Sequence, residues 1–291
     1  MRSRVKKGLV AAATAVAAAA ALTIGTAGNS TAAGPTMQAY GITADGLTMA
    51  AFKTNTPQVT DWVQDITGLD GDTAAIGIDI RPQNNTLYLV GNKGGIYTLN
   101  LVPPPPPPGW VLTASKVGQL TVPLYGTFFG VDFNPPANRL RIISDNGQNL
   151  SHDIDGKLTT DQSTLNNNGS PAKGVTAAAY TNVDLNGDTN TTLFDVDTIN
   201  DTVVIQSPPP TGNLVATGKL TIDVGPNAGL DIFSDLVNGK TVANFGYGTF
   251  AGPDGKYSLY DVNLLTGTAT VIGKFPNAVQ IADVAVALDT M

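Results

Sequence analysis

The sequence predicts an all-β fold, a single five-bladed β-propeller over residues 34–291, and three observations support it. A pattern first seen in Ala75–Pro82 returns in Phe128–Pro135 and, more weakly, at 176–182, 228–232 and 281–286. The composition is poor in helix formers, since all 23 acidic residues are Asp, while Gly, Asn, Thr and Pro are abundant. The two chain ends carry complementary parts of one further unit. A repeat of about fifty residues built of short strands is typical of a propeller blade.

Residues 1–33 are predicted to be a signal peptide that is removed on export. Arg2, Arg4, Lys6 and Lys7 form a positively charged start, and an Ala-rich apolar stretch follows from residue 8 to about residue 25. Small residues then offer cleavage sites near Ala27, Ala32 or Ala33. No later segment is apolar enough to cross a membrane. We therefore expect a secreted, extracellular protein without a membrane span.

Each of the four full units divides into four strands joined by turn residues. The clearest hairpin signal is Asp145-Asn146-Gly147 in the second unit. The strands predicted for the four units in chain order are Ala75–Ile80, Thr86–Gly91, Gly95–Leu101 and Trp110–Leu120; Phe128–Phe133, Arg139–Ser144, Gln148–Asp155 and Lys157–Leu165; Val175–Thr181, Thr191–Asp197, Thr202–Gln206 and Leu214–Ile222; and Gly229–Phe233, Thr241–Gly246, Tyr257–Asn263 and Thr268–Phe275.

The fifth blade is predicted to combine both ends of the chain. The C-terminal unit has only an inner strand, Ile281–Leu288. Met37–Thr43, Leu47–Lys53 and Val59–Ile66 supply the second, third and outer strands, with Asp45-Gly46 as a turn. This pairing closes the ring and leaves no long open sheet edge.

Charge and cysteine content exclude several classes of function. Removal of the signal peptide takes four of sixteen basic residues, which leaves twelve against 23 acidic residues and a net charge of about −11. There is no basic stripe for nucleic acid and no polybasic patch for anionic lipid. The chain has no Cys, so thiol catalysis, disulfides and Cys-zinc sites are excluded. We expect a monomer that binds an extracellular ligand.

Two proline clusters, Pro103–Pro108 and Pro208–Pro210, fall at equivalent places, between the third and outer strands of their units. A docking motif is one interpretation, because six consecutive prolines form a stiff polyproline II segment. A rigid spacer where no ladder hydrogen bond is needed is the interpretation we favour.

Several segments resemble a family of exported bacterial proteins, domain of unknown function 4394. The resemblance covers about residues 37–288 and is most specific over 130–150. It implies a secreted, propeller-like β domain and no particular activity; the six-proline insert departs from the family's usual pattern. The segments that carry the resemblance are GIDIRP, TLYLVG, GVDFNP, NRLRIISDNGQNL and VTAAAYTN.

The best candidates for a site share one aligned position on the five inner strands. Inner strands line the channel, so carboxylates there could converge near one mouth and bind a ligand or a cation. The alternative is that each Asp accepts backbone N–H bonds in a turn of its own blade and acts as a brace, and we favour the brace. The aligned residues are Asp79, Asp132, Tyr180, Asp231 and Asp283.

The loop between the first and second strands of the third unit is a candidate calcium site. Asp184, Asn186, Asp188 and Asn190 place oxygen ligands at alternate residues, as at the start of an EF-hand loop, although the closing Glu is absent. A polar hairpin turn accounts for the same residues. Apart from this calcium we expect no cofactor. His152, the only histidine, is expected to face solvent.

The leading interpretation of function is a secreted, non-enzymatic module. Its ligand would be a cell-envelope or environmental polymer or an exported partner protein. The alternative is a carbohydrate-active hydrolase that divides acid, base or nucleophile roles among the channel aspartates, although the missing Glu weakens it.

Overall fold

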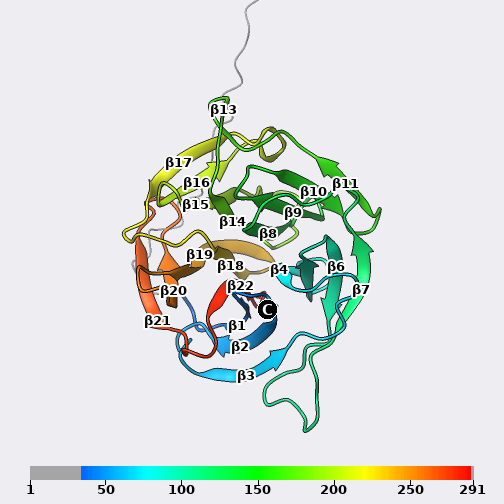
Figure 1. Cartoon of the computed structure of the whole chain (residues 1–291). Helices are drawn as coiled ribbons and strands as arrows, with labels where there is room; N and C mark the ends of the chain where they lie inside the picture. The colour runs from blue at the N-terminus through cyan, green and yellow to red at the C-terminus, as the bar shows by residue number, and fades with distance from the viewer. Residues whose placement is uncertain (1–33, 290–291) are drawn as a thin grey trace, which may run out of the picture. The chain divides into compact units, whose positions relative to one another are not determined.

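The computed structural model describes residues 34–289, and its strands form five four-stranded sheets around a common centre (Figure 1). The predicted five-bladed propeller is confirmed. The predicted signal peptide, residues 1–33, lies outside the described residues. Between residues 34 and 289 there is no α-helix, only the 3-10 turn Pro209–Thr211, so no helix of this part could span a membrane.

Four blades are continuous in sequence and run from an inner to an outer strand. Each pair of neighbouring strands is antiparallel, as hairpin connections require. The bounds are β4 Ala75–Arg81, β5 Thr86–Gly91, β6 Gly95–Leu99 and β7 Ala114–Gln119 in blade 1; β8 Phe129–Asn134, β9 Arg139–Ser144, β10 Asn149–Asp153 and β11 Leu158–Asp161 in blade 2; β14 Val175–Tyr180, β15 Leu193–Asp197, β16 Thr202–Gln206 and β17 Leu214–Lys219 in blade 3; and β18 Ala228–Val237, β19 Lys240–Ala251, β20 Tyr257–Val262 and β21 Ala269–Lys274 in blade 4.

Blade 5 joins the two ends of the chain, as predicted. Its order is β22 (Ile281–Val286), β1 (Gln38–Thr43), β2 (Thr48–Lys53) and β3 (Thr60–Asp65). The inner strand β22 pairs with β1, so the C-terminal strand is held by the first strand of the domain. This pairing closes the ring between the first and last blades.

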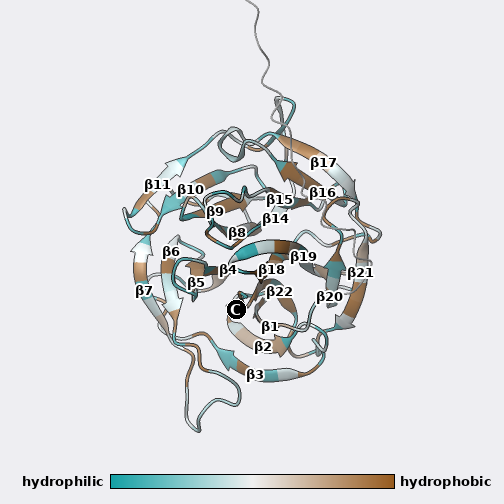
Figure 2. Cartoon of the chain, turned by 180° about the vertical axis from the view of Figure 1, so that it is seen from behind, coloured by the Kyte–Doolittle hydropathy of each residue, from teal (hydrophilic) through white to brown (hydrophobic). Residues whose placement is uncertain are grey.

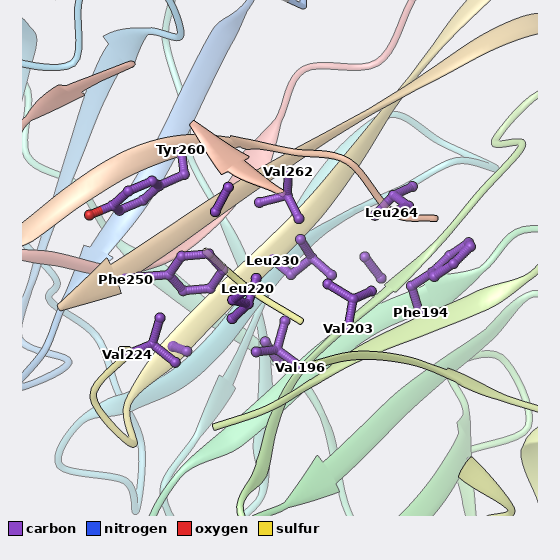
Figure 3. Close-up of a cluster of buried hydrophobic side chains, with 14 of the residues drawn as sticks. Phe194, Val196, Val203, Leu220, Val224, Leu230, Phe250, Tyr260, Val262 and Leu264 are labelled. Carbon is purple, nitrogen blue, oxygen red and sulfur yellow. The ribbon is translucent and has the colours of Figure 1, made fainter. Parts of the chain in front are cut away.

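Hydrophobic side chains pack between neighbouring blades. The inner strands are almost wholly buried, whereas each outer strand has one buried residue and is otherwise exposed or half-buried. The outer strands mix hydrophilic and hydrophobic colours in Figure 2. Figure 3 shows the cluster between blades 3 and 4, in which Val196 and Val203 of one blade pack with Leu230 and Phe250 of the next. Burial of this apolar surface, at about 25 cal/mol per Å², is the main force that holds the blades together.

Blade 4 differs most from the sequence prediction, because β18 and β19 extend to Val237 and Ala251. Their connection is Asn238-Gly239, with φ values of 53° and 70°. Positive φ at both positions defines the two-residue turn that continues the twist of both strands, so the ribbon can lengthen. A small hairpin of β12 (Asn166–Asn167) and β13 (Ser170–Pro171) was not predicted at all.

Candidate functional site

Three inner-strand aspartates converge near the centre of the ring. One carboxylate oxygen each from Asp79, Asp132 and Asp231 lies within 4.8 Å of the other two, and all three residues are buried. They come from β4, β8 and β18, which meet at the centre in Figure 1. The predicted convergence is therefore present for these three residues, although they are shut off from bulk solvent.

Each inner-strand aspartate accepts a hydrogen bond from the backbone of the next blade. The carboxyl group thus satisfies a buried N–H that inner strands leave unpaired on their channel side. We call these four contacts the aspartate clasps. They run from Phe133 N to Asp79 Oδ2 (2.7 Å), from Tyr180 N to Asp132 Oδ1 (3.1 Å), from Val286 N to Asp231 Oδ2 (2.5 Å) and from Ile78 N to Asp283 Oδ2 (2.9 Å).

The clasps correct the favoured brace interpretation in one respect. We expected each Asp to brace a turn of its own blade, but the bonds cross from blade to blade. Asp79 and Asp231 do accept a bond within their own blade as well, each from the next residue at 2.6 Å. The repeat of Asp therefore encodes the joining of neighbouring blades.

The strand register shows that two of the five aligned residues do not occupy the common position. Asp79 and Asp231 lie opposite an aromatic residue on the second strand of their blades. In blade 3 the residue opposite the corresponding aromatic is Ala179, and in blade 5 it is Ala285. Tyr180 thus lies one residue beyond the common position, and in a strand this reverses the direction of its side chain.

Asp283 lies two residues before the common position, on the same face of β22, and still reaches β4. The sequence alignment assigned the common position wrongly in these two strands. The segments Ala177–Tyr180 and Ile281–Val286 are rich in small residues, which do not identify equivalent positions in an alignment. As a consequence, the junction between blades 3 and 4 has Ala179 where a clasp would begin.

Polar residues at the end of β14 join blades 3 and 4 instead. Asn182 donates its backbone N–H to Ser234 Oγ (3.1 Å), and Asn244 Nδ2 donates to Asn182 Oδ1 (2.8 Å). Asp184 adds to this contact, because its Oδ2 accepts the N–H of Thr241 at 2.7 Å.

The candidate calcium loop therefore has a structural role at this junction. Asp184 Oδ1 accepts from Asn186 N at 2.9 Å, and Asn186 Oδ1 accepts from Asp188 N at 3.0 Å. The backbone carbonyl of Asn190 accepts from Asn182 Nδ2. These are the bonds of a polar turn, and calcium binding at Asp184, Asn186, Asp188 and Asn190 stays a prediction.

Burial dominates the electrostatics of the clasps. It raises the pKa of Asp231 to about 6 and that of Asp283 to about 8. Burial, followed by the neighbouring carboxylates, raises the pKa of Asp79 and Asp132 well above the usual range. These carboxyl groups therefore keep their protons to a higher pH than a free Asp does, which reduces the repulsion between them.

A separate cavity of about 340 Å³ lies between blades 2 and 3, and Tyr180 faces it. The off-register position of Tyr180 explains this, because its side chain lies on the opposite face of β14 from that of Ala179. Side chains of β9, β10 and β11 form one wall, and the prolines of the second cluster form another. The lining residues are Asn134, Ala137, Arg139, Arg141, Ser151, Thr160, Gln162, Tyr180, Pro209 and Pro210.

Arg141 organises this cavity from a buried position. Its Nε donates to Tyr180 Oη at 3.2 Å, and its Nη1 donates to Asn149 Oδ1 at 2.6 Å and to Gln162 Oε1. Pro209 is held in place by its carbonyl, which accepts from Asn149 Nδ2 at 3.0 Å. Pro209 and Pro210 of the second proline cluster are thus part of the cavity wall.

Sequence reasoning missed this cavity and misplaced His152. Arg139 and Arg141, which line the cavity, lie within residues 130–150, where the family resemblance is most specific. Their position in this segment was the available signal for the cavity. His152 was expected to face solvent, but it is buried, and its Nδ1 lies 2.9 Å from Thr159 Oγ1. Burial lowers the pKa of His152. It does not line the cavity.

Fold and site together define a β-propeller with a polar cavity between blades 2 and 3 and aspartate clasps at four of its five blade junctions. The family model described as Domain of unknown function (DUF4394) matches residues 48–285, and the chain belongs to this family. No curated protein is significantly similar to it.

Among solved structures, the chain is similar to the glutaminyl cyclase of Myxococcus xanthus, with 12% identity, a TM-score of 0.44, and coverage of 81% of this chain and 94% of that one. It is also similar to the WD40 domain of Toxoplasma gondii coronin, with 12% identity, a TM-score of 0.42 and coverage of 82% and 57%. It is similar as well to an auxiliary nutrient binding protein from Bacteroides ovatus, with 12% identity, a TM-score of 0.42, and coverage of 74% of this chain and 53% of that one. No function is carried over from these structures.

Proposed function

We propose that this protein is a secreted, non-enzymatic, monomeric propeller that binds an extracellular ligand in the cavity between blades 2 and 3. The observation that carries the proposal is the cavity itself, whose volume of about 340 Å³ is lined by side chains with hydrogen-bonding groups and by the Tyr180 ring. Ligand sites in proteins are concave, partly apolar and provided with a few placed polar groups.

The geometry of the aspartates favours binding over hydrolysis. A glycosidase needs two carboxyl groups that flank a substrate bond in a pocket that substrate can enter. Asp79, Asp132, Asp231 and Asp283 are each buried, and each accepts a backbone N–H bond from another blade. None of them lines the cavity.

Secretion is supported by the charged and Ala-rich N-terminal sequence, and a ligand outside the cell follows from it. The ligand classes we propose are a cell-envelope or environmental polymer or an exported partner protein. A pull-down from culture medium together with a glycan array, both with the secreted form of the chain, identifies which class binds.

A cavity-filling variant tests whether the ligand occupies this cavity. Thr160 is exposed on the outer strand β11 and lines the cavity, so Thr160→Trp fills the space without disturbing the core. The matched control is Thr270→Trp, an exposed Thr on the outer strand β21 of blade 4. We expect Thr160→Trp to abolish binding of any captured ligand and Thr270→Trp to leave it unchanged. Equal binding by both variants would refute the proposed cavity.

A further inference from the structure

We infer that the cavity between blades 2 and 3 binds an acidic sugar, and that Arg139 and Arg141 form the pair that receives its carboxylate. The inference rests on the proposed function and specifies its ligand class. Four observations support it, namely the charge of the lining, two free guanidinium donors, an unbalanced buried cation and the shape and chemistry of the remaining wall.

The lining of the cavity is positively charged although the chain as a whole is acidic. Residues 34–291 contain three arginines, and two of them, Arg139 and Arg141, line this cavity, which has no Asp in its lining. A second cavity of about 310 Å³ is lined by Asp145 and Lys173, so its charges balance. A local excess of positive charge in a concave site attracts an anion from a distance.

Each of the two guanidinium groups contains a nitrogen atom without a hydrogen-bond partner in the described part of the chain. Arg141 uses Nε and Nη1 in its bonds, and no residue in the described part of the chain accepts a bond from its Nη2. Arg139 Nη2 lies 3.6 Å from Asp153 Oδ2, while its Nη1 is buried and has no partner within residues 34–289. A planar guanidinium with a free edge is suited to a carboxylate.

Arg141 also lacks an anionic partner of its own. Within the described range, no carboxylate lies within 4.0 Å of it, as the three ion pairs found there involve Arg81, Arg139 and Lys274. Asp195 is fully buried nearby, and neither of its oxygens has a hydrogen-bond partner among the described residues. Burial raises the pKa of Asp195 well above the usual range, and the charge of Arg141 offsets only part of this rise. Arg141 is thus a buried guanidinium without an ion-pair partner in this part of the chain, and such charges are costly unless paired.

The rest of the lining suits a hydroxyl-bearing ring. Asn134, Ser151 and Thr160 offer amide and hydroxyl groups that can bond sugar hydroxyls. The rings of Tyr180, Pro209 and Pro210 provide flat apolar faces. The volume lies at the lower end of the range of small-molecule sites, about 300–1,000 Å³, and leaves room for one or two sugar residues.

The test is calorimetric titration of the secreted form with D-glucuronate, D-galacturonate, D-glucose and inorganic sulfate at low ionic strength. We expect at least one uronate to bind, glucose and sulfate to bind at least tenfold more weakly, and uronate affinity to fall as salt is added. Arg139→Gln should weaken uronate binding about tenfold or more, as expected for loss of a charge-assisted bond. This variant should fold normally because the Arg139 side chain is 36% exposed.

Lys274→Gln is the matched control, because Lys274 is an exposed cation on blade 4 whose loss changes the net charge equally. Uronate affinity that is the same in Arg139→Gln and Lys274→Gln would overturn the inference, and so would glucose binding as tight as uronate. Sulfate binding as tight as uronate would refute the sugar assignment. If a neutral ligand binds and Thr160→Trp blocks it, the inference fails and the proposed function stands; if uronate binds and Thr160→Trp does not block it, the proposed cavity fails.

Discussion

Replacement of Asp283 by Asn should flatten the dependence of stability on pH. Burial raises the pKa of Asp283 from 3.8 to about 8 in the folded protein. Between these two values the folded state keeps a proton that the unfolded state has lost, so the free energy of unfolding falls as pH rises. The contribution of this one group is about 1.4 kcal/mol per pH unit, or about 3 kcal/mol from pH 5 to pH 7.

Other buried aspartates with a raised pKa act in the same direction, so the wild-type slope should be steeper still. Asp283→Asn keeps a side-chain oxygen for the N–H of Ile78, which Asp283 accepts at 2.9 Å, but it removes the titrating proton. We therefore expect a slope that is shallower than that of the wild type by about 1.4 kcal/mol per pH unit between pH 5 and pH 7.

Urea unfolding followed by fluorescence of Trp62 and Trp110, the two tryptophans, measures this slope. Asp65→Asn is the control, since it makes the same replacement at an exposed residue, on β3. A slope for Asp283→Asn equal to that of the wild type would refute the reasoning, because it would mean that Asp283 is ionised in both states across this range.

Three further predictions concern the ring and the candidate calcium loop. Asp79→Ala leaves the buried N–H groups of Ile80 and Phe133 without an acceptor and should destabilise the protein by about 2 kcal/mol or more in urea unfolding, against little change for Asp65→Ala. Deletion of residues 281–291 removes β22 and opens the ring, so cooperative unfolding should be lost; a truncated chain that melts like the full chain would contradict the closure. If calcium binds the loop at 184–190, the melting temperature should be higher in millimolar calcium than in chelator. Asp188→Ala should abolish this difference. Equal melting temperatures of the unchanged protein in the two buffers would mean that the loop is only a polar turn.

The fold could be predicted from the sequence because blade turns and strand alternation are local. Thr86–Gly91 and Thr202–Gln206 were predicted with their observed bounds, and the pairing of both chain ends followed from counting strands. The lengths of β18 and β19 could not be predicted, because the period-two pattern does not say where pairing stops on a solvent-exposed ribbon.

The site was predicted only in part, because its geometry depends on contacts between blades. The convergence of Asp79, Asp132 and Asp231 follows from the repeat, since equal positions on inner strands face one centre. That their carboxyl groups bond the backbone of the next blade does not follow, because sequence gives no register between separate sheets. The cavity that contains Arg141 and Tyr180 lies between two such sheets and could not be found for the same reason.

The most direct test of the proposed ligand site is a titration of the secreted form with uronate, followed by NMR of the arginine Nε–Hε groups. Only Arg81, Arg139 and Arg141 remain after removal of the predicted signal peptide, so three resonances report on the whole domain. Arg81 pairs with Asp155 on blade 2 and does not line the cavity. We predict that the resonances of Arg139 and Arg141 shift together with one saturation curve while that of Arg81 stays in place. A shift of all three in proportion to ionic strength, or of none, would contradict the account.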